Sequence, residues 1–129
     1  MLFQTFRSQA ERRRQGGSCF VELQFCRMPP GTPVRRLVDV DSIRNWMDDS
    51  LYVDDETVLY REYGRFFTGG VYNNLRRGPV DLYGINYYES AMIDPLMERL
   101  RREQPPEYET LMGWLERAKD YNGFYILGI

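Results

Sequence analysis

The chain has 129 residues, 43% hydrophobic and 28% charged, which is typical of one folded domain that needs no disulfide or metal to complete its core. The sequence contains no histidine. This excludes Ser-His and Cys-His nucleophile pairs and Cys2His2 zinc sites, and it removes the commonest general base.

The formal net charge is −2, but the charges are unevenly distributed along the chain. Residues 1–36 carry seven arginines against two glutamates, whereas residues 37–60 carry one arginine against seven acids. Such segregation predicts separate positive and negative surface patches, which would steer association with charged partners. The alternative is that these residues form ordinary solvated faces.

Two cysteines, Cys19 and Cys26, lie seven residues apart on one expected strand. An odd separation places them on opposite faces, so they cannot form a disulfide with each other, and free thiols indicate a reducing compartment. No apolar run approaches the roughly 18 residues of a membrane-spanning helix, and the N-terminus lacks the apolar region of a secretory signal. We therefore expect a cytoplasmic protein without a membrane partner.

The N-terminal stretch 2–15 has Leu2, Phe3, Phe6 and Ala10 at helical spacing, followed by three consecutive arginines. This pattern predicts a short amphipathic helix that ends at the glycines at positions 16 and 17. We interpret residues 1–18 as an amphipathic or partly disordered extension and residues 19–129 as the folded domain.

Two strands are expected next. Residues 19–26 alternate apolar and polar side chains, which is the clearest strand pattern in the chain. Three prolines in residues 29–33 exclude a helix or a central strand there, and residues 34–40 resume as a second strand.

Helices are expected on both sides of residues 51–53, whose own structure the sequence leaves ambiguous. Asp41 or Ser42 can cap a helix that continues to Asp48. From Asp54 the apolar residues again have helical spacing up to residue 67, although the same β-branched and aromatic residues also suit a strand.

The stretch 69–90 holds four of the ten tyrosines and four of the eleven glycines. Residues 71–75 and 80–88 are expected to form two strands joined by a turn at residues 76–79. Neither face of the second strand is cleanly apolar, which favours an edge hairpin or a cavity wall.

The C-terminal part predicts two helices and a strand. Proline opens each helix, at residues 95–103 and 106–120, and an almost wholly apolar strand follows at residues 124–129. The fold class expected for the whole chain is α+β: a single two-layer domain with helices on one face of a mixed or antiparallel sheet of about five strands.

The acids of residues 39–56 are the first candidates for chemistry. Asp39 and Asp41 follow an expected strand and could hold a divalent cation or supply acid–base groups, although the spacing does not fit an EF-hand loop. Together with Arg76 and Arg77, they define one hypothesis: a nucleotide-like small-ligand binder or a small metal-dependent hydrolase. The competing interpretation is that these acids cap helices.

The favoured hypothesis is a non-enzymatic protein-binding module, most concretely an inhibitor or immunity-type protein that blocks another protein, such as a basic toxin or nuclease. It requires no cofactor and no metal. Acidic, tyrosine and arginine side chains are the expected contacts, because arginine and tyrosine dominate many interface energies. The predicted contact residues are Asp48, Asp49, Asp54, Asp55, Tyr72, Arg76, Arg77, Tyr83 and Tyr87.

Direct nucleic-acid binding is disfavoured, because the chain is net acidic and carries no recognition signature for DNA or RNA. A homo-oligomer built on an aromatic face is a third hypothesis.

Overall fold

The computed structural model describes residues 1–15 and 20–128 and shows one α+β domain built on an open antiparallel sheet. The six strands lie in the order β2-β1-β6-β5-β3-β4. Their bounds are Val21–Phe25 (β1), Leu51–Val53 (β2), Thr68–Tyr72 (β3), Arg77–Pro79 (β4), Ile85–Tyr88 (β5) and Phe124–Leu127 (β6). The predicted α+β class and the single domain with an antiparallel sheet are confirmed, with one strand more than the five expected.

Among the residues that the structure describes, the chain also forms five α-helices and two 3-10 turns. The α-helices are Gln9–Gln15 (α1), Val34–Leu37 (α2), Glu56–Tyr63 (α3), Ile93–Glu103 (α4) and Tyr108–Ala118 (α5), and the 3-10 turns are Val40–Ser42 (η1) and Ser90–Met92 (η2). The helices predicted after residues 54, 95 and 106 are therefore confirmed as α3, α4 and α5. None of the helices among residues 1–15 and 20–128 is long and apolar enough to cross a membrane.

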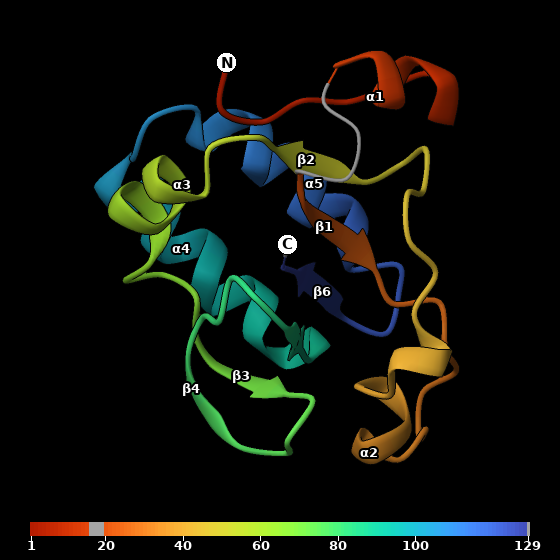
Figure 1. Ribbon diagram of the computed structural model, residues 1–129. Coiled ribbons are helices and arrows are strands. Elements are labelled where there is room, and N and C mark those ends of the chain that lie inside the picture. The colour runs from red at the N-terminus through yellow and green to blue at the C-terminus, as the bar shows by residue number, and fades with distance from the viewer. Residues whose placement is uncertain (16–19, 129) are drawn as a thin grey trace.

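The sheet buries side chains on both faces because alternate residues of a strand point in opposite directions. On β6, Phe124 and Ile126 belong to the main core with α3, α4 and α5, whereas Tyr125 and Leu127 belong to a smaller cluster. That smaller cluster is covered by α2 and the residues that follow it, and Figure 1 shows α2 well apart from α3, α4 and α5. The predicted final strand lies between β1 and β5, which confirms its central position.

Aromatic rings join α5 to the sheet. Phe25 lies between Trp114 and Tyr121, with ring centroids 4.4 and 4.5 Å apart and nearly parallel planes. The indole Nε1 of Trp114 donates a hydrogen bond of 2.9 Å to the carbonyl of Asp49. The core therefore fixes the position of the segment that precedes β2.

The N-terminal helix is shorter than predicted, because Leu2 to Phe6 run extended along the outer edge of β2. The backbones of Gln4 and Tyr52 exchange two hydrogen bonds of 2.8 Å. Leu2, Phe3 and Phe6 are buried, so this stretch contributes to the core. The predicted helix end at residues 16 and 17, the predicted boundary between residues 18 and 19, and Cys19 lie outside the described residues.

The strand predicted at residues 34–40 is wrong: the chain forms α2 and then η1 there. Pro33 starts the helical turn, and its carbonyl accepts hydrogen bonds from the amides of Arg36 and Leu37. Proline suits the beginning of a helix because its ring fixes φ and it has no amide proton to satisfy. Leu37 and Val38 are thereby turned onto the sheet.

The helix predicted from Asp41 to Asp48 is also wrong, because only η1 forms and residues 43–50 are irregular. The backbone amides of Trp46 and Met47 donate to the Glu22 carboxylate on β1, so they are not available for a helical ladder. Trp46 moreover has a φ of 67°, which is outside the helical region.

The hairpin within residues 69–90 lies earlier in the chain than predicted: β3 and β4 occupy residues 68–72 and 77–79, whereas the sequence predicts strands at residues 71–75 and 80–88. β3 and β4 are joined by a turn at residues 73–76, where the Asn74 side chain accepts a hydrogen bond of 3.0 Å from the Arg76 amide and Leu75 has a φ of 68°. Asparagine in such turns bonds the backbone two residues on. Residues 80–84 form a loop, and β4 lies at the edge of the sheet.

Candidate functional site

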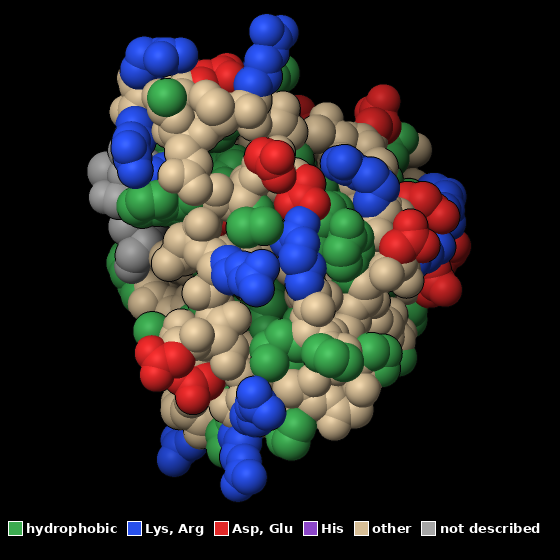
Figure 2. Space-filling view, turned by 90° about the vertical axis from the view of Figure 1, so that its right-hand side faces the viewer, with side chains coloured by type: hydrophobic (Ala, Val, Ile, Leu, Met, Phe, Trp, Pro, Cys, Tyr) green, Lys and Arg blue, Asp and Glu red, His purple; other side chains and the backbone are tan. Residues whose placement is uncertain are grey.

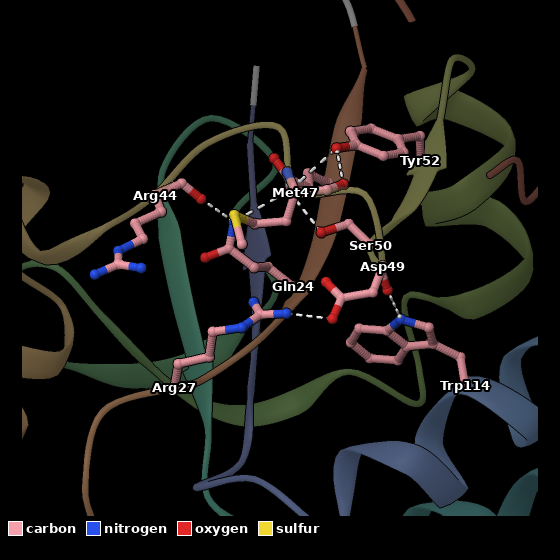
Figure 3. Close-up of polar contacts among 9 residues, drawn as sticks. Gln24, Arg27, Arg44, Met47, Asp49, Ser50, Tyr52 and Trp114 are labelled. Carbon is pink, nitrogen blue, oxygen red and sulfur yellow. Dashed lines mark hydrogen bonds and ion pairs between the residues drawn. The ribbon is translucent and has the colours of Figure 1, made fainter. Parts of the chain in front are cut away.

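A buried carboxylate, that of Glu22, organises the β1–β2 side of the sheet. Figure 3 shows Gln24, Ser50 and Tyr52 on this side. Glu22 is 3% exposed and points to the face opposite the main core. It accepts hydrogen bonds from the amides of Trp46 and Met47, at 2.8 and 3.1 Å. It accepts two more from the hydroxyl of Ser50, at 2.6 Å, and from the side-chain amide of Gln24, at 3.0 Å.

The hydroxyl of Tyr52 donates to the Met47 carbonyl at 2.6 Å and lies 3.4 Å from the Glu22 carboxylate. We call this set of residues the Glu22 cluster: Glu22, Gln24, Ser50, Tyr52 and the backbone of residues 46–47. Burial and the Glu22 charge raise the pKa of Tyr52 well above its usual range. With four donors already on the carboxylate, the cluster is a brace that holds residues 46–52 against the sheet.

The helix α1 lies over this brace. Arg12 is 2% exposed, and its guanidinium lies 4.1 Å from the centroid of the Trp46 ring. A hollow of about 320 Å³ separates α1 from residues 46–48, and Arg12, Trp46 and Tyr52 are among its lining residues. The arginine-rich α1 is therefore packed on the domain through a cation–π contact.

A second hollow, of about 400 Å³, lies on the other side of residues 44–49. Its lining includes Gln24, Arg27, Asp41 and Arg44. Figure 3 shows Gln24 between the two arginines, and Arg27 is ion-paired with Asp49. Arg44 forms no ion pair with any residue that the structure describes. This hollow therefore offers one guanidinium without an ion pair beside the buried side chain of Gln24 and the exposed carboxylate of Asp41.

Figure 2 shows the side of the molecule that carries α1 and α2. Lys and Arg side chains gather at its top and bottom ends, and near its centre they lie next to acidic side chains. The charges are thus mixed over this side, without one extended patch of a single sign.

A third depression lies between α3 and the loop that follows β4; we call it the α3 groove. It has a volume of about 580 Å³ and is lined by Glu56, Thr57, Tyr60 and Arg61 from α3 and by residues 80–83 from the loop. The loop is held by the buried side chain of Asn86, which accepts from the Asp81 amide at 2.8 Å and donates to the Asp81 carbonyl at 2.7 Å.

The α3 groove has an apolar floor and an aromatic rim. Val80 and Leu82 are 7% and 8% exposed, whereas Tyr60 and Tyr83 are 55% and 78% exposed. A third tyrosine adjoins it: partial burial raises the pKa of Tyr72, and the nearby Asp81 and Tyr60 raise it further. Exposed tyrosines over an apolar floor are typical of a surface that contacts another molecule.

Two acidic side chains, Glu56 and Asp81, line this groove. Asp54 and Asp55 directly precede Glu56, and Asp81 lies on the opposite wall. Asp55 caps α3 by accepting from the Val58 amide at 3.0 Å, and Asp81 accepts from the Tyr83 amide at 2.9 Å. Within residues 1–15 and 20–128, none of these four carboxylates forms an ion pair.

Eight of the nine predicted contact residues lie at three places in the structure. Asp54, Asp55, Tyr72 and Tyr83 lie in or beside the α3 groove, as described above. Arg76 and Arg77 lie on the β3–β4 hairpin, where Arg77 bonds the Gly69 carbonyl and lies 3.8 Å from Glu89. Asp48 and Asp49 lie in the segment before β2, next to α1 and Arg27.

Tyr87, also predicted as a contact residue, is buried. It is 4% exposed, and its hydroxyl donates to the Asn122 carbonyl at 2.7 Å. Burial raises the pKa of Tyr87 above its usual range, and the neighbouring Cys26 and Glu89 add to this effect. Tyr87 therefore packs the smaller core beside β6 and offers no surface to a partner.

Asp39 and Asp41 do not converge on one site. The Asp39 carboxylate caps η1 by accepting from the Asp41 amide at 3.0 Å, and Asp41 alone lines the hollow beside Arg44. Arg76 and Arg77 are not among the residues that line this hollow. No group of three or more Cys, Asp or Glu side chains that could hold a metal ion occurs in the described part of the chain.

The sequence did not single out Glu22, Tyr60 or Asp81. Glu22 alternates with apolar residues, as a solvent-facing strand residue does, so its burial depends on residues 46–50, which lie far along the chain. Tyr60 and Asp81 become neighbours only when α3 packs beside the loop. No local signal distinguished Tyr60, because it lies at the margin of the apolar face that Leu59 and Tyr63 form on the predicted helix.

Comparison with known proteins leaves the function to be argued from this geometry. The chain matches no protein-family model, and neither the curated proteins nor the solved structures contain a match.

Proposed function

We propose that this chain is a non-enzymatic protein-binding module whose most concrete role is that of an inhibitor or immunity-type protein, and that the α3 groove is its contact surface. The observation that carries the proposal is the pair of exposed tyrosines, Tyr60 and Tyr83, above the apolar floor of Val80 and Leu82. Tyrosines in such positions are among the residues that contribute most to protein–protein affinity.

Two further observations support this assignment. The carboxylates next to the groove have no ion-pair partner in the described part of the chain, so their charges are available to a bound protein. The buried Glu22 carboxylate, in contrast, already accepts four hydrogen bonds and is engaged in holding the fold.

Matched surface variants test the proposal. Tyr83→Ala and Tyr60→Ala should each weaken binding of a co-purified partner by about 2 kcal/mol or more, which is roughly 30-fold in the dissociation constant. Leu75→Ala is the control, because Leu75 is 56% exposed on the β3–β4 turn and lines none of the three hollows described above. Equal affinities for all three variants would overturn the proposal.

A second candidate function is binding of a small anionic ligand, such as a nucleotide, in the hollow beside Arg44. The specific observation is the uncommitted Arg44 guanidinium next to the buried Gln24 and to Asp41. A ligand at about 100 times its dissociation constant stabilises the fold by about 2.7 kcal/mol, so thermal melts with a nucleotide panel, with and without Mg²⁺, should show an upward shift. Arg44→Gln should abolish that shift. A melting temperature that no ligand of the panel changes would rule out this second function.

A further inference from the structure

We infer that the occupant of the α3 groove is a basic segment of the partner protein, with an arginine or lysine side chain seated between Tyr60 and Tyr83. This inference rests on the proposed function and names the chemistry of the partner. Its support comes from the charges at the groove, from the aromatic rim and from the apolar floor.

The groove carries more acidic than basic side chains: Glu56 and Asp81 are among its lining residues, against one base, Arg61. The Nε of Arg61 lies 3.2 Å from the Glu62 carboxylate, so this base already has an acidic partner. Glu56 and Asp54 form no ion pair among the described residues. A cation arriving at the groove therefore meets carboxylates that need not first give up a partner, which favours both its attraction and its retention.

The tyrosine rim suits a cation as well as an apolar group. Aromatic faces attract guanidinium and ammonium groups within about 6 Å of the ring centroid. This protein uses such contacts internally: Arg12 lies over Trp46, and Arg65 lies 4.3 Å from the centroid of Phe66. No arginine among the described residues is stacked on Tyr60 or Tyr83.

The floor of the groove fits the rest of such a side chain. Arginine and lysine cover apolar surface with their methylene stems while the charged end remains at a polar or wet position. Val80 and Leu82 provide that apolar surface, and Glu56 and Asp81 lie on opposite walls of the same groove. An acidic segment would instead face several unpaired carboxylates, which disfavours it.

Small amino-acid probes test this chemistry on the whole protein. The blocked amides N-acetyl-arginine, N-acetyl-lysine, N-acetyl-leucine and N-acetyl-glutamate methylamide are titrated to millimolar concentration, and backbone amide resonances are followed by NMR. We expect saturating shifts at Thr57, Tyr60, Leu82 and Tyr83 with the arginine and lysine probes, and at least about fivefold weaker binding of the leucine and glutamate probes.

Charge-removing variants provide the matched control. Asp54→Asn combined with Glu56→Gln should weaken the arginine probe about fivefold or more, whereas Glu109→Gln on α5 should leave it unchanged. Shifts of equal size with leucine or glutamate, or no shifts at the groove up to the highest probe concentration, would overturn the inference. Self-association through the groove, detected by light scattering and abolished by Tyr83→Ala, would also overturn it.

The same experiments separate this inference from the proposed function. If Tyr83→Ala weakens the partner but neither added salt nor the Asp54/Glu56 double variant does, the groove is a contact surface and the basic occupant is wrong. If Tyr60→Ala and Tyr83→Ala both leave partner binding as strong as the Leu75→Ala control does, the proposed function itself fails.

Discussion

The Glu22 cluster and the α3 groove both bring carboxylates together with tyrosine, yet they differ in how far these groups are satisfied. Glu22 is almost wholly buried and accepts four hydrogen bonds. The acids at the groove are exposed or half-exposed and lack ion pairs among the described residues, and Tyr60 and Tyr83 extend into solvent. Buried polar groups must be paired within the fold, so groups left unpaired at the surface are the ones available to a partner.

Residue type alone therefore does not distinguish a structural site from a functional site in this protein. A glutamate on a strand and an aspartate before a helix have the same chemistry in the sequence. What distinguishes them is the number of donors that the fold brings to each carboxylate. Substitutions in the Glu22 cluster should therefore reduce stability, whereas substitutions in the α3 groove should reduce binding.

Removing the Glu22 carboxylate should have the largest effect. Glu22→Ala leaves the amides of Trp46 and Met47 and the hydroxyl of Ser50 without their acceptor. Since each buried donor left unsatisfied costs about 1–3 kcal/mol, we expect a loss of about 3 kcal/mol or more in the free energy of unfolding. Urea denaturation at constant slope measures it.

Glu22→Gln and Glu109→Ala are the controls for this experiment. The amide keeps one acceptor oxygen but presents a donor to the remaining groups, so its loss should be intermediate. Glu109 is exposed on α5, and its removal should stay within about 0.5 kcal/mol of the wild type. Equal stability of Glu22→Ala and wild type would show that the cluster is no brace.

Arg12→Ala should have the second largest effect, because Arg12 is buried and stacks on Trp46. We expect a loss of about 2 kcal/mol, from the cation–π contact and the packing of the side-chain stem. Arg12→Lys keeps the charge but not the planar guanidinium, so it should recover only part of the loss. The fluorescence of Trp46, in a Trp114→Phe background, reports the local change, and an unchanged emission spectrum in Arg12→Ala would contradict the contact.

The Glu22 cluster should also respond to alkaline pH through Tyr52, whose pKa is raised in the folded state by burial and by Glu22. Above about pH 10 the unfolded chain loses the tyrosine proton while the folded chain retains it, so the free energy of unfolding falls as pH rises. The contribution of Tyr52 to this slope is about 1.4 kcal/mol per pH unit.

Tyr52→Phe isolates that contribution. The variant should be less stable at neutral pH, since the hydrogen bond to the Met47 carbonyl is lost, but its stability should fall less steeply between pH 10 and 11. Urea midpoints at several pH values provide the measurement. Parallel curves for variant and wild type would contradict the raised pKa.

Local signals in the sequence predicted much of the fold. The Asp55 cap of α3 acts within a few residues, and the apolar periodicity of α4 and α5 lies within each helix, although α4 begins at Ile93, before Pro95, and α5 at Tyr108, after the second of its two preceding prolines. The apolar run of β6 marks a central strand without further information. Those elements were therefore accessible from the sequence.

The elements that were mispredicted depend on distant residues. Residues 43–50 form no helix because two of their backbone amides donate to the carboxylate of Glu22, which lies more than twenty positions earlier in the sequence. Residues 2–6 lie extended because they pair with the outer edge of β2. Of the contact residues, Asp54, Asp55, Tyr72 and Tyr83 were named from composition. Their grouping with Tyr60 and Asp81 required the packing of α3 beside the loop, which no local pattern encodes.

The smallest effect on stability is expected at the groove, and it is the sharpest test of the comparison. Tyr60 and Tyr83 are 55% and 78% exposed, so Tyr60→Ala and Tyr83→Ala should each change the free energy of unfolding by no more than about 0.5 kcal/mol. A surface kept for a partner contributes to binding without contributing to the fold. If either variant instead unfolded as readily as Glu22→Ala, that tyrosine would be part of the scaffold, and the distinction between the two regions would no longer hold.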